Sequence, residues 1–474
     1  KAINMGNKKA IVFSLSGDLG SGKTVFSRSI GRELGITQKI LSPTFVLYNQ
    51  YPLNNSLFNI FYHFDLYRLN TETEYEEISF LSHFLAGTIS CLEWPENMGI
   101  SFYQQLKKKA NLITVNFIYL DDHTRKYLFL FPNNMYILGI ETSCDDTCAA
   151  LLKDRQIISN IISSQVDLHR QWGGVVPDIA KRAHQAKILP VIDIALKRAK
   201  IKITDVNLIA VTKGPGLAIA LSVGINTAKE LAIKYHKKIV GVNHVEGHLL
   251  ANFLTNSHGR PIRPFIFPSL ALTVSGGHTK IILINQTGDY EIVGETLDDA
   301  AGEALDKSAK LLGLGYPGGP VIERLAKTGD STFLKLPTPI ADKKILDYSF
   351  SGLKTAFYYQ IKDWPKNKIN SHLADLAASF QTAVFDTLLR KYTLAIEKYQ
   401  PKCLLLSGGV AANLELRKRS RELAKKYNLP LYLPFKKELN TDNAAMIALA
   451  GYYQSQRGDF ANPRTLDIDS RAEL

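Results

Sequence analysis

The first part of the chain alternates short apolar runs with polar turns, which predicts strands and helices in succession. Ala10–Leu15 has the character of a strand, Gly17–Thr24 is a glycine-rich loop, and Val25–Leu34 has helical periodicity that ends at Gly35. Further strands are expected at residues 57–69, 88–93, 112–119 and 126–131. This order of strand, loop and helix indicates an α/β module.

A second and longer module begins at residue 136, where strands and helices alternate again. Apolar runs typical of strands occupy residues 136–142, 148–153, 207–212, 238–242, 269–275, 280–284, 403–407 and 430–433. Helical periodicity occupies residues 178–199, 220–235, 300–312, 371–398, 413–427 and 441–455. The alternation predicts α/β sheets, and we find no short-period repeat.

A turn-type sequence at residues 132–135 joins the two modules. We therefore expect one domain at residues 1–131, a short linker at 132–135, and the second module from 136 onward. Because an extended residue spans at most about 3.3–3.6 Å, so short a joint predicts that the modules are close neighbours.

The composition, 45% hydrophobic and 21% charged over 474 residues, is that of a globular protein and argues against disorder. No apolar run reaches the roughly 18 residues needed to cross a bilayer, and no secretory leader is recognisable, so we expect no membrane association. The four cysteines are too few for a disulfide framework and indicate the cytoplasm.

The net charge of +13 is unevenly divided along the chain. Residues 1–134 hold 13 Lys and Arg against 11 Asp and Glu, so nearly all of the positive excess belongs to the second module. Such an excess has two interpretations: a polyanionic partner, or a basic but otherwise ordinary protein surface. A basic helix is the strongest candidate surface, with Lys343 and Lys344 in a loop expected nearby. The cations of the helix are Arg417, Lys418, Arg419, Arg421, Lys425 and Lys426.

Gly17–Thr24 fits the pattern G-x-x-x-x-G-K-T between a strand and a helix, which predicts a phosphate-binding loop. Glycine lets the backbone N–H groups turn toward a phosphate, and the helix N-terminus adds partial positive charge. Lys23 is expected to reach the terminal phosphates of ATP and Thr24 to hold Mg²⁺. The ATP-binding residues are predicted to be Leu19, Gly20, Ser21, Gly22, Lys23 and Thr24.

A Mg²⁺ site takes a second acidic ligand at a strand end. Glu93 follows the apolar run Thr88–Leu92, and Asp65 is the other candidate, with a catalytic role in orienting water. Together with Ser42-Pro43-Thr44-Phe45 and the stretch from His63 to Arg68, these motifs make residues 8–131 resemble the TsaE family of small bacterial ATPases. The resemblance implies a P-loop NTPase-like fold with Mg²⁺ on Thr24 and Glu93.

In the second module, His244 and His248 are spaced i, i+4 and would share one helix face, where they could chelate a metal ion. The alternative is two unrelated histidines on a helix. Glu246 lies two residues from each histidine and is rotated by about 200° on a helix. It is therefore misplaced for the general base of a zinc protease, which argues against a metalloprotease.

Three turns follow predicted strands, two of them with a Gly-Gly pair, and their order is that of actin-like and sugar-kinase-like ATPases. They lie at residues 140–147, 273–279 and 406–413. Glycine in such turns lets the backbone approach a nucleotide or phosphate closely. The turns alone leave a small-molecule kinase of the actin-like class open as an alternative.

A larger set of motifs makes residues 136–455 resemble the TsaD family of tRNA threonylcarbamoyltransferases. These motifs are Ile140–Thr147, Gly173–Pro177, His244–His248, Val274–Thr279, Asp298–Glu303, Asp306-Lys307, Tyr316–Pro320, Ser349–Thr355 and Thr441–Asn443. Two carboxylates are one methylene shorter than in the family, at Asp146 and Asp178. The resemblance implies a two-lobed actin-like (ASKHA) fold with lobes at 136–250 and 251–474, where part of the C-terminal helix returns to the first lobe.

The resemblance also implies site residues. The metal ligands would be His244, His248 and Asp442, and the phosphate-loop candidates are Ser143 and Asp145. The metal would be iron, with zinc as the alternative. The threonylcarbamoyl-AMP site would use Thr273, Val274, Ser275, Gly276, Gly277, Asp306, Gly319 and Asn413.

The implied activity is transfer of a threonylcarbamoyl group from threonylcarbamoyl-AMP to the exocyclic amine of adenosine 37 in ANN-decoding tRNAs. The fused module would hydrolyse ATP, with Mg²⁺, to support turnover. The implied partners are tRNA, an inactive TsaB-like paralogue and a TsaC-like threonylcarbamoyl-AMP synthase. A non-enzymatic, ATP-dependent binding protein is the remaining alternative.

Overall fold

The computed structural model describes residues 9–43, 46–54, 57–69, 71–119, 125–130, 135–172, 174–342 and 344–474. Thr44, Phe45, Gly173, Lys343 and residues 132–134, which carry parts of the predictions above, lie outside the described residues. The chain divides into two compact units, residues 1–133 and 134–474. Each unit has hydrophobic clusters of its own.

The first unit is one six-stranded sheet in the order β2-β3-β4-β1-β5-β6. Strands β3, β4, β1 and β5 are parallel, and the edge strands β2 and β6 are antiparallel to their neighbours. The elements are β1 (Ala10–Ser16), α1 (Lys23–Glu33), β2 (Tyr48–Pro52), β3 (Ile60–Asp65), α2 (Glu72–Glu77), β4 (Thr88–Glu93), α3 (Ile100–Lys109), β5 (Ala110–Tyr119) and β6 (Arg125–Leu130).

The strands of the first unit appear as unbroken apolar runs, without polar alternation, because the sheet is covered on both faces. Ile11 and Leu15 on β1 face a cluster that includes Ile30 of α1, whereas Ala10 and Val12 face a cluster that includes Phe102 of α3. The strand expected at 57–69 is confined to Ile60–Asp65, and β2, α2 and α3 were not predicted. These missed elements are polar, edge-located or short, so they lack a strong apolar period.

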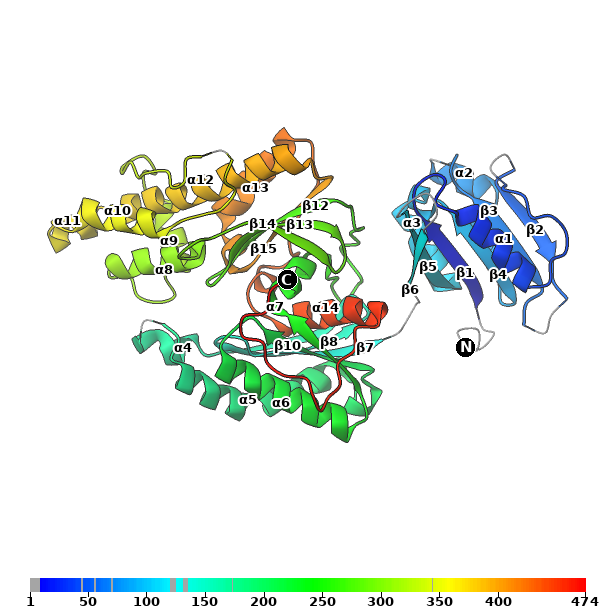
Figure 1. The fold of residues 1–474 in the computed structure, drawn as a ribbon, viewed down its shortest axis with the longest axis horizontal. Coiled ribbons are helices and arrows are strands. Elements are labelled where there is room, and N and C mark those ends of the chain that lie inside the picture. Colours follow the sequence, from blue (N-terminus) through cyan, green and yellow to red (C-terminus); the bar gives the residue numbers. More distant parts are fainter. Residues whose placement is uncertain are drawn as a thin grey trace. The chain divides into compact units, whose positions relative to one another are not determined.

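The second unit contains two five-stranded sheets (Figure 1). Its strands are β7 (Tyr136–Glu141), β8 (Asp146–Lys153), β9 (Gln156–Ser164), β10 (Leu208–Gly214), β11 (Lys238–Asn243), β12 (Ser269–Val274), β13 (Thr279–Gln286), β14 (Asp289–Glu295), β15 (Cys403–Ser407) and β16 (Leu431–Tyr432). Its helices are α4 (Val166–His169), α5 (Pro177–Ala199), α6 (Ala218–Lys234), α7 (His244–Leu250), α8 (Ala301–Leu311), α9 (Gly318–Ala326), α10 (Ser351–Ile361), α11 (Lys366–Ser371), α12 (Leu373–Tyr399), α13 (Leu414–Lys426) and α14 (Ala444–Arg457).

The two sheets of this unit share one topology. Their strand orders are β11-β10-β7-β8-β9 and β14-β13-β12-β15-β16. In each, the first three strands along the chain form an antiparallel meander, the fourth pairs in parallel with the first, and the fifth pairs in parallel with the fourth. The unit therefore contains a structural duplication that was not visible as a repeat in the sequence.

Helices separate and cover the two sheets. Helices α5 and α6 pack on one face of the first sheet and α14 on the other, where α14 contacts β7, β8 and β10 (Figure 1). The cluster around α14 and α7 also includes Ala271 of β12 and Leu405 of β15, so it spans both sheets. A Cβ on Gly139 of β7 would lie 2.2 Å from the carbonyl oxygen of Ala444, which shows how closely α14 packs there.

The second sheet is covered on its other face by α8, α10 and α12, whose apolar side chains form a separate large cluster. Strands β9 and β14 and helices α9 to α11 were not predicted from the sequence. Strands β9 and β14 are largely half-buried, which weakens their apolar pattern. Within the described part of the chain, no helix has both the length and the apolar character needed to cross a bilayer.

Candidate functional site

The glycine-rich loop of the first unit connects β1 to α1. Gly22 caps the helix with a φ of 102°, a backbone conformation that favours glycine. The Lys23 ammonium group donates hydrogen bonds to the carbonyl oxygens of Gly17 and Asp18, at 2.6 and 2.9 Å, and lies 3.8 Å from the ring centroid of Trp94. Lys23 is thus held over the loop in which a phosphate would lie.

Desolvation and nearby acids act on this lysine in opposite directions. Burial lowers the pKa of Lys23, against the opposing effect of Glu93 and Glu96. Within the same loop, the Ser21 hydroxyl is buried and finds no hydrogen-bond partner among the described residues, whereas Leu19 is exposed. A buried hydroxyl without a partner suits a loop that would enclose a polar ligand.

Glu93, at the end of β4, is the acidic centre of this site. Its carboxylate accepts hydrogen bonds from Thr24 at 2.9 Å and from Ser27 at 3.4 Å, and lies 2.6 Å from Nε2 of buried His63. The structure thus brings together the two predicted Mg²⁺ ligands, Thr24 and Glu93, whose oxygen donors fit that ion. Sequence reasoning gave no role to Ser27 or His63, since each touches Glu93 only through the fold.

Asp65 ends β3 directly beside Glu93, because β3 and β4 pair in parallel register. Its carboxylate accepts hydrogen bonds from the Ser42 hydroxyl at 3.3 Å and from the Tyr67 backbone N–H at 3.1 Å. These contacts hold Asp65 at the same sheet edge as the P-loop.

In the second unit, α7 and the segment before α14 meet at a cluster of two imidazoles and one carboxylate. Asp442 Oδ1 lies 3.4 Å from Nε2 of His244 and 3.3 Å from Nε2 of His248. One donor atom from each of the three residues lies within 4.8 Å of the others. The two histidines share a helix face because Asn243 caps α7 and starts the helix at His244.

The two imidazoles and one carboxylate fit a divalent metal ion, both in their chemistry and in the hydrogen bonds that they leave unmade. Both ring nitrogens of His248 are buried without a well-formed hydrogen bond to any described residue. Burial lowers the pKa of His248, which favours the neutral imidazole that a metal requires. Burial also opposes protonation of His244, but Asp442 and Glu141 outweigh it and raise the pKa of His244.

Glu141, at the end of β7, fixes the orientation of His244. Its carboxylate accepts from His244 Nδ1 at 2.9 Å, from the Thr212 hydroxyl at 2.6 Å and from the Ser143 backbone N–H at 2.5 Å. A hydrogen bond from Nδ1 leaves Nε2 directed toward Asp442 and His248, as in carboxylate–histidine–metal arrangements. The sequence placed Glu141 in a motif but did not assign it this role.

Glu246 faces away from the histidine pair. Its carboxylate accepts hydrogen bonds from the Tyr290 hydroxyl at 3.0 Å and from the Gln454 side-chain amide at 2.8 Å. The helix therefore presents its imidazoles and this carboxylate to different neighbours, which keeps Glu246 away from the position of the general base in a zinc protease.

The turn between β7 and β8 adds further acidic groups near this cluster. Ser143 Oγ lies 3.1 Å from His244 Nδ1. Burial raises the pKa of Asp145 and, more strongly, raises that of Asp146 to about 7. The turn is thus a low-dielectric region in which carboxyl groups resist ionisation.

The turn from Thr273 to Gly277 joins β12 to β13 and approaches the same cluster. The next residue, His278, has its ring centroid 6.2 Å from that of His244, and burial lowers its pKa to about 3. Gly408 adopts a φ of 89° and packs so closely that a Cβ there would lie 2.4 Å from the carbonyl oxygen of Val274. Two of the predicted glycine turns are therefore in contact.

Asp306 and Gly319 are also brought together. Asp306 Oδ1, on α8, accepts hydrogen bonds from the backbone N–H groups of Gly318 and Gly319, at 2.8 and 2.9 Å. Asn413 instead caps α13 and donates a hydrogen bond to Gln381 at 2.8 Å. The polar side-chain atoms of Asn413 already have protein partners.

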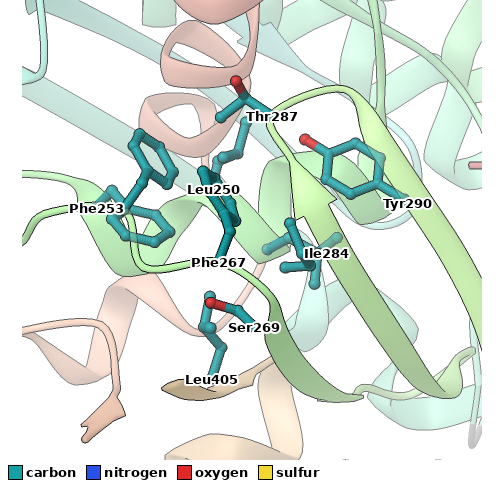
Figure 2. A pocket seen from close by; sticks show the side chains of 10 residues that line it. Leu250, Phe253, Phe267, Ser269, Ile284, Thr287, Tyr290 and Leu405 are labelled. Carbon is teal, nitrogen blue, oxygen red and sulfur yellow. The ribbon is translucent and has the colours of Figure 1, made fainter. Parts of the chain in front are cut away.

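Beside α7, apolar side chains surround a void of about 10 Å³, room for about one water molecule (Figure 2). Its lining residues are Leu249, Leu250, Phe253, Phe265, Phe267, Ser269, Ile284, Thr287, Tyr290 and Leu405. The void is a small gap in the packing beside α7 and is too small for a substrate.

Comparison with known proteins identifies two family matches along the chain. Residues 156–449 match the family described as "tRNA N6-adenosine threonylcarbamoyltransferase", and residues 1–127 match "Threonylcarbamoyl adenosine biosynthesis protein TsaE". A protein of Thermosipho africanus named for the first activity is 48% identical over 324 residues, 68% of this chain and 96% of the relative.

A second relative and one solved structure are also similar to parts of this chain. A relative of the same name from Dictyoglomus turgidum is 49% identical over 325 residues, 68% of this chain and 95% of the relative. Among solved structures, HypF from T. kodakarensis aligns with a TM-score of 0.48 and 13% identity, over 73% of this chain and 52% of that one.

Proposed function

This chain belongs to the tRNA N6-adenosine threonylcarbamoyltransferase family, and on that premise we propose that it transfers threonylcarbamoyl from threonylcarbamoyl-AMP to adenosine 37 of ANN-decoding tRNAs. The observation that carries the proposal is the buried cluster of His244, His248 and Asp442, ordered by Glu141, in a chain of this family. The fused TsaE-family module hydrolyses ATP in support of turnover.

The proposed architecture is a P-loop NTPase-like domain, residues 1–131, joined by residues 132–135 to a two-lobed actin-like fold. The duplicated sheet topology supports two lobes, at 136–250 and 251–474. The packing of α14 on β7, β8 and β10 supports the return of the C-terminal helix to the first lobe.

For the transfer reaction, His244, His248 and Asp442 would hold one divalent metal, iron in our proposal and zinc as the alternative. Such an ion supplies a Lewis acid that polarises substrate oxygens. Glu141 holds the Nδ1 proton of His244 and keeps the imidazole in one tautomer. Ser143 and Asp145, in the β7–β8 turn, would contact the phosphate side of the substrate.

The remaining substrate contacts come from the second lobe. Thr273, Val274, Ser275, Gly276 and Gly277 present a glycine turn to the adenylate, and Asp306 orders the amides of Gly318 and Gly319 beside it. Asn413 acts by fixing the start of α13. Transfer requires no nucleophilic side chain, because the adenosine amine attacks the carbamoyl carbon and AMP leaves.

In the ATPase module, Lys23 binds the terminal phosphates of ATP, Thr24 and Glu93 hold Mg²⁺, and Asp65 orients the attacking water. The P-loop residues Leu19, Gly20, Ser21 and Gly22 complete the phosphate site through their backbone N–H groups.

The proposed partners are tRNA, a TsaB-like paralogue and a TsaC-like synthase that supplies threonylcarbamoyl-AMP, in the cytoplasm. Helix α13 carries Arg417, Lys418, Arg421, Lys425 and Lys426, which suit phosphate contacts. Arg419 of the same helix is paired with Asp386. On α5, exposed Leu189 and Ile194 offer apolar contacts for a protein partner.

Mass analysis of tRNA nucleosides tests the transfer reaction. The chain is incubated with tRNA, threonine, bicarbonate, ATP and the two partner proteins. Wild type is expected to produce threonylcarbamoyladenosine, and the double variant His244→Ala/His248→Ala is expected to produce none, because two of three metal ligands are removed. His258→Ala, which removes an exposed histidine, is the control. Full activity of the double variant would contradict the proposal.

A further inference from the structure

A basic, aromatic pocket lies between α8 and α10, apart from the sites described above. Its cavity volume is about 420 Å³, within the range of sites that bind small ligands or single nucleotides. Its lining residues are Lys307, Lys310, Leu311, Lys354, Thr355, Tyr358 and Tyr359. The proposed transfer reaction gives no role to these lining side chains.

The pocket arises from helical spacing on α8 and α10, which pack against each other. On α8, Lys307, Lys310 and Leu311 are three and four residues apart, so they share one face. On α10, Lys354 and Tyr358 are four residues apart, as are Thr355 and Tyr359. The two faces oppose each other across the cavity.

Ion pairs and helix caps hold the two walls together. The Asp299 carboxylate lies 2.7 Å from the ammonium of Lys307 and 3.1 Å from that of Lys354, so it links α8 to α10. Asp298 accepts hydrogen bonds from the backbone N–H groups of Phe350 and Ser351, at 2.7 and 3.2 Å, and so fixes the start of α10. The pocket is therefore built on anchored elements.

Two exposed tyrosine rings and two lysines without ion-pair partners among the described residues lie together at this surface. Tyr358 and Tyr359 are 45% and 61% exposed, and their ring centroids lie 5.5 Å apart at 64°. Lys362 lies 4.9 Å from the Tyr359 ring. Lys307 and Lys354 are neutralised by carboxylates, whereas Lys310 and Lys362 form no ion pair within the described part of the chain.

Exposed aromatic rings beside unpaired lysines match the chemistry of single-stranded nucleic acid. A base stacks on an aromatic face, and a neighbouring phosphate meets an ammonium group. An apolar peptide would leave the lysines unpaired, and a paired duplex would not present its bases to the rings. An unpaired nucleotide satisfies both features of the pocket.

The location of the pocket also suits the proposed acceptor. Helix α8 begins where the amide of Gly302 donates to the carbonyl oxygen of Ser275, in the turn proposed to contact the adenylate. Asp306 and Lys307 are adjacent on that helix, with Asp306 bonded to the Gly318–Gly319 amides and Lys307 in the pocket. One helix therefore connects the pocket to the proposed reaction site.

We propose that the pocket between α8 and α10 binds an unpaired nucleotide of the substrate tRNA, with the base against Tyr358 and Tyr359 and a phosphate near Lys310. This inference rests on the proposed function, since it assigns part of the tRNA-binding surface. It identifies a contact separate from both α13 and the reacting adenosine.

Binding of an unmodified ANN-decoding tRNA transcript to the full-length chain tests the stacking contact. Tyr359→Leu is expected to weaken binding about tenfold, because it removes the aromatic face. Tyr359→Phe keeps that face and is expected to bind as wild type does. Equal weakening by both variants, or none by Tyr359→Leu, would overturn the proposal.

The salt dependence of the same affinity tests the phosphate contact. Lys310→Glu is expected to reduce the slope of log affinity against log salt by about one. Lys398→Glu is the matched control, because Lys310 and Lys398 both lie in the last turn of a helix. Equal slopes for the two variants would contradict a phosphate at Lys310.

Unchanged ATP turnover and metal content in each variant establish that the protein is folded. A wild-type chain that binds tRNA and modifies it, with pocket variants that bind equally well, would overturn this inference alone. A wild-type chain that binds no tRNA would count against the proposed function as well, so the two failures are distinguishable.

Discussion

The phosphate-loop site and the histidine cluster have similar local structure, but the buried carboxylate has a different role in each. In both, a helix follows a parallel strand: α1 follows β1 after the glycine-rich loop, and α7 follows β11 directly. In both, a buried glutamate at a strand end accepts hydrogen bonds from a hydroxyl group and contacts an imidazole. The shared feature is a carboxylate held rigidly by several donors.

The difference lies in what the carboxylate does. Glu93 contacts Thr24 directly and is the proposed metal ligand, with His63 behind it. Glu141 lies behind His244, and the imidazole is the proposed ligand. Each site pairs a carboxylate with an imidazole. With the carboxylate as the ligand the pair suits a hard ion such as Mg²⁺, and with the imidazole as the ligand it suits a transition metal.

The strongest test of this comparison is loss of the P-loop lysine. Lys23→Ala is expected to reduce ATP turnover by about 10²–10³-fold, because it removes a charge placed at the terminal phosphates. Turnover is measured with and without the TsaB-like paralogue, and the metal content of the histidine cluster is expected to stay unchanged. Lys39→Ala, an exposed lysine of the same unit, is the control. Loss of metal together with ATP turnover would show that the sites are not separate.

A smaller effect is expected behind the histidine cluster. Glu141→Gln should weaken metal affinity about 10–100-fold, because it weakens the hydrogen bond that orients His244. Competition with a chelator measures this affinity. Glu246→Gln is the matched control on α7, since its carboxylate contacts Tyr290 and Gln454 instead of the imidazoles. Equal losses in the two variants would refute the positioning role.

The last expected effect concerns pH. Burial raises the pKa of Asp146 from 3.8 to about 7, so the folded chain retains a proton that the unfolded chain releases. Its contribution to stability is therefore present below about pH 4 and is lost as pH rises toward 7. In the metal-free protein, wild type is expected to lose about 2–3 kcal/mol of stability between pH 5 and pH 8 through this group.

Thermal unfolding across that range provides the measurement. Asp146→Asn stays neutral and should unfold with a flatter dependence on pH than wild type. Asp178→Asn, which changes an exposed carboxylate, should keep the wild-type slope. If the unfolding temperature of wild type does not decrease as the pH is raised from 5 to 8, the assignment is contradicted.

Contiguous features were the ones that the sequence revealed. The glycine-rich loop was predictable because eight successive residues carry both the turn glycines and the lysine that lies over them. Strands buried on both faces, such as β1 and β12, were visible as apolar runs. The polar edge strand β2 and the half-buried strands β9 and β14 were missed, since their side chains show no clean alternation.

The sequence by itself determined the α/β class, the P-loop with Lys23 and Thr24, and the shared face of His244 and His248, because each depends on local spacing. Only the tertiary structure decided that Glu141, His244 and Asp442 meet, that His63 touches Glu93, and that the two sheets repeat one topology. These contacts join residues far apart in the chain. Strand pairing and helix packing bring them together, and no local pattern of residues encodes such pairings.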